Sequence, residues 1–504
     1  MSVHFSPTET HIPTSLFPSG QNLKDIARRS LLSVVQYHRE LGAKNHWLFL
    51  ALAVGILVRS YFLPQAIRGD EAFTFLYYVN ADLRSLFDYS STNNHVLNTL
   101  LIKLSAFIFG ASPASIRFPA FLTGILAIAI TFYAARAVGK NRNSGILAGM
   151  ALAVFPYLVL YSTNARGYTL VVLFTLLLVM IGERFVNNPS KTGVLLMAFC
   201  AALGMLAIPI MVLPIAGISL WIVCLMFLKK FALRAVLLRF VFPFGLLSGI
   251  FTLILYAPII IASNGPAPII ANKFIQSVSW DVFLPQIVPH VQATFAELSR
   301  DIHPAVLLAM LALAALGLFD SAKRRNWGML LILPCLLVGA WLILFIQRTT
   351  LYPRMWTYAI PFVLLAADAG LAILLDRLPH PAQTSINAAL ALGGVFVAIN
   401  LMSRNVIARY LDSGAFPEAP LAVEYLKPII TPEDSLRVSP TAQWPVYFYL
   451  WYDQAPQPRL EQNATDGRLF FVSKKSRGPL DDDAAQRFTL LLDMDNMALY
   501  QEKR

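Results

Sequence analysis

Two adjacent carboxylates, Asp70 and Glu71, stand in the segment IRGDEAFTFLYYVN (67–80), directly after the apolar run WLFLALAVGILVRSYFLP. A carboxylate at the edge of an apolar, low-dielectric region can have a raised proton affinity and act as a general base. The alternative role is structural, because Asp70 could cap a helix that begins at Glu71, with Glu71 favourable in its first turn. Taken alone, the pair fits both roles.

Two further segments carry arginines that could bind phosphate. YSTNARGYTL (161–170) contains Arg166, and QRTTLYPRMWTYAIP (347–361) contains Arg348 and Arg354. Guanidinium groups bind phosphate through paired hydrogen bonds. Arginines beside aromatic residues at a membrane boundary also serve as plain anchors, and for Arg348 we favour that interpretation. Carboxylates and arginines on one face of a membrane suit the transfer of a group from a lipid phosphate.

The composition excludes an ordinary soluble protein. Hydrophobic residues make up 57% and charged residues only 13% of the 504 residues, which indicates a multi-span membrane protein. The formal charge of +12 comes from short basic groups between apolar runs. This pattern orients a protein in a bilayer, so we do not expect nucleic-acid binding. The three cysteines lie in apolar runs and support neither a disulfide framework nor a cysteine metal site.

Eleven apolar segments are long enough to cross a bilayer as helices. They lie at 47–64, 117–138, 145–161, 168–186, 192–206, 207–228, 239–261, 304–319, 327–346, 356–375 and 385–402.

Whether 95–110 is a twelfth span is decided by the basic residues in the later loops. If this segment does not cross, the later basic groups fall on the same, cytoplasmic side as the basic N-terminal segment. These groups are Arg136/Lys140/Arg142, Arg184/Lys191, Lys229/Lys230/Arg234 and Lys323/Arg324/Arg325. We therefore expect 95–110 to lie on the outer leaflet as an amphipathic or re-entrant helix.

These patterns predict an α-helical polytopic membrane protein in three parts. Residues 1–45 form a cytoplasmic segment with an amphipathic helix. Residues 46–402 form the transmembrane domain, whose external loop 65–116 carries the acidic pair. Residues 403–504 form a small external α/β domain, with strands expected in SLRVSP, RLFFVS and FTLLLDM and helices in APLAVEYLKP and DDDAAQRF. The N-terminus is expected inside and the C-terminus outside the cytoplasmic, or inner, membrane. NAT at 463–465 matches a glycosylation sequon.

Five motifs, read in chain order, resemble the GT-C superfamily of membrane glycosyltransferases. They are RGDEAFT, NNHVLNTLLIKLSAFIFG, SIRFPAFLTGILAIAITFYAARAVG, YSTNARGYTL and YPRMWTYAIPFVLLAADAG. The branch they resemble most contains the dolichyl-phosphate-mannose protein mannosyltransferases and their bacterial relatives, including the aminoarabinose transferase that modifies lipid A. The similarity is strongest before residue 190 and looser around 347–370.

The resemblance implies an inverting transferase that moves a sugar from a polyprenyl-phosphate donor to a protein, lipid A or a glycan at the outer membrane face. Asp70 matches the essential acidic position of the family. His95 matches a His-Pro-Pro-Leu run, but NHVLN lacks its prolines, so the shape of the acceptor loop departs from the family. The expected site residues are Asp70 and Glu71 for catalysis, Arg166, Arg354, Arg117 and Arg348 for the donor phosphate, and His95, Asn94 and Tyr168 for the acceptor loop.

Other interpretations remain open at this point. His290, Glu297, Asp301 and His303 share one predicted external loop and could hold a divalent cation, as some relatives do, but a solvated loop is favoured because no tight motif such as HExxH is present. A transporter or flippase for lipid-linked saccharides would use similar residues, although such folds usually carry internal repeats and charges inside their spans. A non-catalytic scaffold is the third alternative.

Overall fold

The computed structural model describes residues 45–141, 143–270, 276–440, 442–460, 467–475 and 486–503. The chain divides into two units, Met1–His46 and Trp47–Arg504, and nearly all described residues belong to the second. The predicted amphipathic helix before residue 45 and the sequon at 463–465 lie outside the described residues. Most of the predicted helix in DDDAAQRF lies outside them as well.

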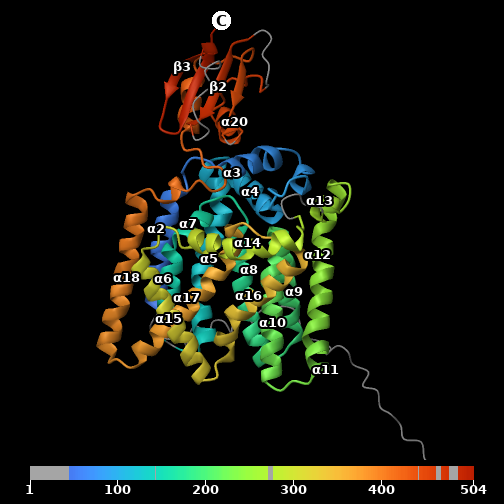
Figure 1. Cartoon of the computed structure of the whole chain (residues 1–504), viewed down its shortest axis with the longest axis vertical. Helices are drawn as coiled ribbons and strands as arrows, with labels where there is room; N and C mark the ends of the chain where they lie inside the picture. The colour runs from blue at the N-terminus through green and yellow to red at the C-terminus, as the bar shows by residue number, and fades with distance from the viewer. Residues whose placement is uncertain are drawn as a thin grey trace, which may run out of the picture. The chain divides into compact units, whose positions relative to one another are not determined.

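Helices occupy each of the eleven segments predicted to span the membrane (Figure 1). They are α2 (Asn45–Phe62), α5 (Pro113–Gly139), α6 (Ile146–Val154) with α7 (Pro156–Ser162), α8 (Tyr168–Asn187), α9 (Lys191–Ala207), η3 (Pro209–Met211) with α10 (Val212–Leu228), α11 (Leu233–Val236) with η4 (Leu237–Val241) and α12 (Phe242–Ala262), α15 (Pro304–Lys323), α16 (Trp327–Gln347), η5 (Pro353–Ala359) with α17 (Ile360–Asp376), and α18 (His380–Ser403). Within the described ranges, eight helical stretches are long and apolar enough to cross a membrane unaided. The chain is a multi-pass integral membrane protein.

The segment predicted to lie on the outer leaflet forms helix α4 (Val96–Phe109), which has 14 residues. A helix of that length rises about 21 Å, less than the ~30 Å of a hydrocarbon core. Figure 1 shows α4 beside α3 at the end of the helix bundle away from α11. The predicted external loop between α12 and α15 is also partly helical, because it contains α13 (Ala267–Ile270) and α14 (Trp280–Leu298).

The third span is broken between α6 and α7 by Pro156, which has no N–H to donate to the carbonyl of Leu152. Arg59 of α2 is completely buried at this break. Its Nη2 donates to the Leu152 carbonyl at 3.3 Å and its Nη1 to the Ala153 carbonyl at 2.7 Å. An arginine inside the bundle thus replaces the missing backbone donor and joins α2 to α6. After the break, α7 leads into the 163–167 loop, which contributes Arg166 to the site described below.

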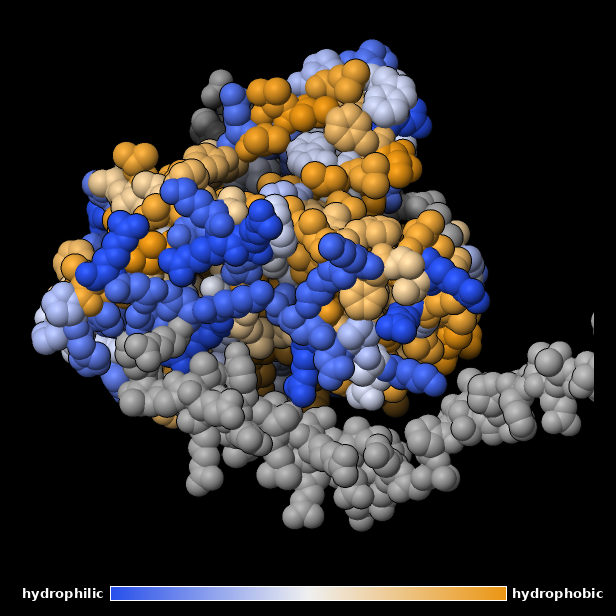
Figure 2. Space-filling model, turned by 90° about the horizontal axis from the view of Figure 1, so that it is seen from below, coloured by the Kyte–Doolittle hydropathy of each residue, from blue (hydrophilic) through white to orange (hydrophobic). Residues whose placement is uncertain are grey.

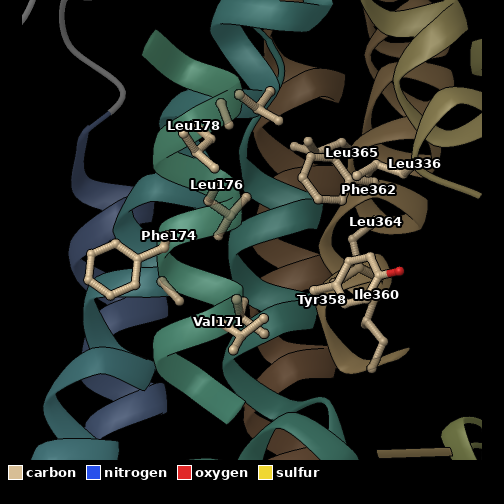
Figure 3. Packing of buried hydrophobic residues seen from close by; sticks show 14 of the residues in the cluster. Val171, Phe174, Leu176, Leu178, Leu336, Tyr358, Ile360, Phe362, Leu364 and Leu365 are labelled. Atoms are coloured by element: carbon tan, nitrogen blue, oxygen red, sulfur yellow. The ribbon is translucent and has the colours of Figure 1, made fainter. Parts of the chain in front are cut away.

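The apolar core lies around α8 and η5–α17, the most buried of the long helices among the described residues. Figure 3 shows their side chains filling the space between the helices, together with Leu336 of α16. The labelled residues are Val171, Phe174, Leu176 and Leu178 of α8 and Tyr358, Ile360, Phe362, Leu364 and Leu365 of η5–α17. Tyr168 begins α8 and Arg354 lies in η5. This packing therefore fixes the positions of these two residues relative to each other, and both belong to the site described below.

Basic residues gather at one end of the bundle. Figure 2 shows the face at which α11 lies, and hydrophilic residues cover much of it. Lys140, Arg184, Lys229 and Lys323 stand at the C-terminal ends of α5, α8, α10 and α15, which run toward this face. The pattern agrees with the predicted cytoplasmic assignment of this face. The orientation of the termini stays a prediction.

The C-terminal part contains a four-stranded sheet in the order β1-β2-β4-β3. The strands are β1 (Ser435–Val438), β2 (Leu469–Lys474), β3 (Phe488–Asp493) and β4 (Met497–Glu502). β1 is parallel to β2, and the other two pairs are antiparallel. The sequence predicts β1, β2, β3 and helix α19 (Ala419–Leu426), but it does not predict β4 or helix α20 (Gln443–Tyr452). Aromatic residues crowd the α20 sequence QWPVYFYLWY and favour strands on propensity alone.

Candidate active site

Glu71 is held as a buried anion by three parts of the chain. Arg117 of α5 donates Nε to Oε1 at 2.8 Å and Nη2 to Oε2 at 2.5 Å. The backbone amides of Arg68 and Ala165 donate at 2.8 and 2.6 Å. Burial alone would raise the pKa of the Glu71 carboxyl, but the Arg117 charge and the hydrogen bonds from Arg117 and Ala165 hold this pKa below its usual value. Glu71 therefore joins helix α3 (Gly69–Thr74) to α5 and to the 163–167 loop.

Asp70 has a different environment, although it directly precedes Glu71 in the chain. Its side chain is 32% exposed, and its Oδ2 lies 3.9 Å from Nη2 of Arg166. The expected capping alternative is corrected by the structure, because α3 starts after Arg68 and the carboxylate of Glu71, not of Asp70, accepts the Arg68 amide. The Asp70 amide itself donates to the Ser413 carbonyl at 3.1 Å. The Asp70 carboxylate therefore does not cap α3, and it lines the cavity described below.

A connecting segment, residues 407–414, leads from α18 toward the C-terminal part and is tied to the start of α3. Arg68 is nearly completely buried. Its Nη1 donates to the carbonyls of Tyr410 and Asp412 at 2.7 and 2.8 Å, and its Nη2 donates to that of Ile407 at 2.8 Å. Arg68 therefore donates to backbone carbonyls of the connecting segment. The Asp412 carboxylate remains available for other side chains.

The tautomer of His95 follows from its hydrogen bonds. The Gly167 amide donates to Nδ1 at 2.9 Å, and burial together with the charges of Arg166 and Arg354 holds the pKa of His95 well below its usual value. The neutral ring therefore carries its proton on Nε2. That N–H meets Nη2 of Arg166 at 3.2 Å, where two donors converge. Arg166 is further held by Asn93, which accepts from Nη1 through its carbonyl and its Oδ1 at 2.9 and 2.5 Å.

Arg354 is fixed on the neighbouring wall of the same cavity. Its Nε donates to the hydroxyl of Tyr168 at 3.0 Å, and its Nη1 donates to Oδ1 of Asp412 at 3.0 Å. The guanidinium also lies over the Tyr352 ring, 4.5 Å from its centre. Asp412 accepts a further hydrogen bond from the Tyr161 hydroxyl. The connecting segment therefore orients an arginine of the cavity wall.

A cavity of about 640 Å³ lies between these residues. Its polar wall carries Asp70, Asn93, His95, Arg166, Tyr168 and Arg354, and its apolar wall is formed by Ile208, Ile210, Val212, Leu213, Leu344, Leu351 and Met355. Phe73 and Trp444 also line it. Polar groups that converge beside an apolar wall are typical of sites for amphipathic ligands.

Four of the predicted site residues do not line the cavity, and two of them, Arg117 and Glu71, pair with each other. Arg117 is fully buried and donates to the carbonyls of Leu63, Gln65 and Ala66 in addition to Glu71, against the expectation that it contacts the donor phosphate. It is the counter-ion of Glu71. Glu71 itself is likewise buried and not placed for proton transfer.

Arg348 and Asn94 also have local roles in the structure. Arg348 ends α16 and lies over the ring of Trp280, 5.9 Å from its centre, as the anchor interpretation expects. Asn94 donates Nδ2 to the carbonyls of Leu86 and Asp88 at 2.9 and 2.7 Å, so it closes the loop before α4. Neither side chain reaches the cavity wall, which limits the expected donor and acceptor contacts to the residues named above.

The four residues considered for a divalent cation do not come together. His290 accepts from Nε1 of Trp356 at 3.2 Å, Glu297 pairs with Arg300 at 2.8 Å, and His303 accepts from the Ala305 amide at 3.3 Å. No group of three or more His, Cys, Asp or Glu side chains placed to hold a metal ion occurs among the described residues.

Comparisons with known proteins agree with this fold. Residues 96–261 match the family model described as dolichyl-phosphate-mannose-protein mannosyltransferase. The chain is similar in structure to ArnT from Cupriavidus metallidurans in the apo state, with a TM-score of 0.54 and 14% identity over 91% of this chain and 98% of ArnT. ArnT bound to undecaprenyl phosphate matches with a TM-score of 0.51, at the same identity and coverage. No curated protein sequence matches the chain.

The predicted resemblance to the GT-C membrane glycosyltransferases is thus confirmed. The family model covers the segment from α4 to α12, and the ArnT-like fold extends over most of the chain.

Several residues at or near the cavity, among them Phe73, Asn93, Asp412 and Trp444, were not among the predicted site residues. Asp412 and Trp444 both follow the last span and reach the site only through the fold. The sequence signal for Asp412 is weak, because a single carboxylate after a helix is common. Trp444 stands in an aromatic run that the sequence does not link to the cavity.

The two carboxylates should respond differently to loss of charge. Glu71→Gln leaves Arg117 buried without a counter-ion, so we expect a loss of about 3–5 kcal/mol of unfolding free energy. Asp70→Asn should change stability little, because its carboxylate is partly exposed and the Ser413 carbonyl still accepts its amide. Thermal unfolding of both variants in the same detergent measures the difference.

The pH dependence of unfolding gives the control. Because the folded pKa of Glu71 is lowered, its contribution to stability is present above the ordinary carboxyl pKa and disappears as the pH falls toward the folded value. Glu71→Gln should therefore flatten this acidic part of the stability profile. Equal stability loss in both variants would contradict the division of roles.

Proposed function

We propose that this chain is an inverting glycosyltransferase that moves a sugar from a polyprenyl-phosphate donor to an acceptor at the outer face of the cytoplasmic membrane. The observation that carries the proposal is the cavity in which convergent N–H donors face a carboxylate beside an apolar wall. The N-terminus would lie inside and the C-terminus outside.

The donor phosphate would bind where Nη2 of Arg166 and Nε2–H of His95 converge. Two donor nitrogens 3.2 Å apart can share one acceptor, and a phosphate oxygen supplies one. Nε of Arg166 is buried and has no hydrogen-bond partner within the described residues, which is a further donor for an anion. Arg354, aligned by Tyr168 and Asp412, would hold a second phosphate oxygen. The binding of undecaprenyl phosphate by ArnT supports this class of ligand.

The polyprenyl chain would lie along the apolar wall. Ile208, Ile210 and Val212 stand where α9 gives way to α10, and Leu344 and Met355 stand across the cavity on α16 and η5. An isoprenoid chain has no hydrogen-bonding groups, so it is suited to a wall without polar side chains. The phosphate would thus sit at the polar end of the cavity with its lipid directed toward the membrane.

Transfer would proceed as a single displacement. Asp70 accepts the proton of an acceptor hydroxyl or amine as that atom attacks the anomeric carbon of the donor sugar. The bond between this carbon and the phosphate oxygen breaks, and the electron pair leaves with the polyprenyl phosphate. Arg166, His95 and Arg354 stabilise the negative charge that develops on the departing phosphate. This mechanism applies to any sugar carried on the donor. It also applies to an acceptor that is a protein, lipid A or a glycan.

Asp70→Asn tests the proposal most simply. Asparagine keeps the size of the side chain but cannot accept the acceptor's proton at neutral pH, so we expect transfer to fall at least ~100-fold while donor binding and folding persist. Transfer of a radiolabelled sugar from a synthetic polyprenyl-phosphate donor measures this on purified full-length protein.

The wild-type measurement separates the proposal from its rivals. Donor binding without transfer to any acceptor would favour a transporter or flippase, and absence of both would favour a scaffold. Normal transfer by Asp70→Asn would remove the assignment of Asp70 as the base.

The proposed role of Arg354 in phosphate binding is tested against Arg348, an arginine that does not line the cavity. Arg354→Ala should weaken binding of the donor lipid by about 1.5–3 kcal/mol, because a charge-assisted contact with the phosphate is lost. Arg348→Ala is the control, since Arg348 lies over Trp280 and does not line the cavity. Isothermal titration with polyprenyl phosphate compares the two, and an equal effect of both substitutions would reduce Arg354 to a membrane anchor.

A further inference from the structure

We infer that the acceptor is a neutral saccharide, held against an aromatic wall formed by Phe73 of α3 and Trp444 of α20. This inference rests on the proposed function and names the acceptor class of the same cavity. It also assigns the C-terminal part of the chain a direct role in acceptor binding, since Trp444 follows strand β1.

The aromatic wall combines a residue of α3, before the second span, with a residue of α20 in the C-terminal part. Phe73 and Trp444 both line the cavity, and their rings meet edge to face with centres 4.7 Å apart. Tyr77 stacks on Phe73 at 5.2 Å with the ring planes 12° apart, and Tyr77 is 45% exposed. Tyr447 packs against Trp444 at 5.9 Å. The aromatic surface thus continues from the cavity past the end of α3 to Tyr77 and along α20 to Tyr447.

The position of the aromatic wall next to Asp70 indicates that the wall binds the acceptor and not the donor sugar. Asp70 and Phe73 are three residues apart on α3, so their side chains share one face of the helix. In a single displacement the acceptor approaches the anomeric carbon from the side opposite the leaving phosphate, and its proton goes to Asp70. In this assignment Arg166 and His95 hold the phosphate, and the aromatic wall receives the acceptor. A ring that rests on Phe73 would therefore present its hydroxyl to Asp70.

The charges that line the cavity select a neutral acceptor. Asp70, Arg166 and Arg354 are the charged residues of the lining, and the proposed reaction uses all three. The lining also includes Ser91 and Thr92, whose hydroxyl groups are neutral. An anionic or cationic acceptor would find no unused counter-charge among these described residues. The C–H faces of a sugar ring, by contrast, match the negative face of an aromatic ring, and its hydroxyls match neutral polar side chains.

Trp444→Ala tests the inference with a readout that does not depend on activity. Binding of a neutral oligosaccharide to the purified full-length protein, without donor, is measured by saturation-transfer NMR and titration. We expect Trp444→Ala to weaken this binding about tenfold and Trp444→Phe to retain most of it. Tyr425→Ala is the control, because Tyr425 is a 39% exposed aromatic residue on α19 that does not line the cavity. Thermal unfolding confirms that each variant is folded.

Transfer assays on the same samples complete the test. Trp444→Ala should raise the KM for the oligosaccharide by the same factor and leave the Kd for polyprenyl phosphate unchanged. An unchanged KM would overturn the aromatic wall, and an equal rise in the donor constant would place the rings on the donor sugar. Wild-type transfer to a serine/threonine peptide or to lipid A, with none to oligosaccharides, would overturn the acceptor class alone. Wild-type protein that neither binds nor uses the donor would contradict the proposed function itself.

Discussion

The buried ion pair between Glu71 and Arg117 is the interaction on which the site depends. It joins α3, which lies outside the spans, to the first turns of α5, and through the Ala165 amide it also holds the 163–167 loop. The loop carries Arg166, and α3 carries Asp70. Because breaking such a pair leaves a buried charge without a partner, the three segments keep one arrangement. A carboxylate that does no chemistry thus fixes the distance between the proposed base and the proposed phosphate ligand.

A second set of contacts extends this arrangement toward the C-terminal part. Arg68 binds the backbone of the connecting segment 407–414, and Asp412 of that segment binds Arg354 on the cavity wall. The amide of Ile67, just before α3, donates to the hydroxyl of Tyr449 on α20 at 3.1 Å. The segment after the last span therefore contributes to the orientation of the cavity residues. In the proposed reaction, this makes the C-terminal part a component of the site.

The sequence predicts the general fold well, because the apolar segments are long and the basic groups between them are regular. It also predicts that Asp70, Arg166, His95, Tyr168 and Arg354 share one site, and all five line the cavity. It could not separate Asp70 from Glu71, since neighbouring helical residues point in different directions and only the packing decides which one is buried. For the same reason Arg117, predicted as a phosphate ligand, is instead the partner of Glu71. Asp412 and Trp444 reach the cavity through contacts between distant parts of the chain, which no local pattern reveals.

The anomeric configuration of the product tests the account most directly. Asp70 is the one carboxylate in the described lining of the cavity, so the site has a base but no second carboxylate to form a covalent glycosyl intermediate. Proton NMR of the product from a donor of known configuration would report the outcome. A single displacement predicts complete inversion at the anomeric carbon. Retention of the donor configuration would contradict an in-line single displacement with Asp70 as the base.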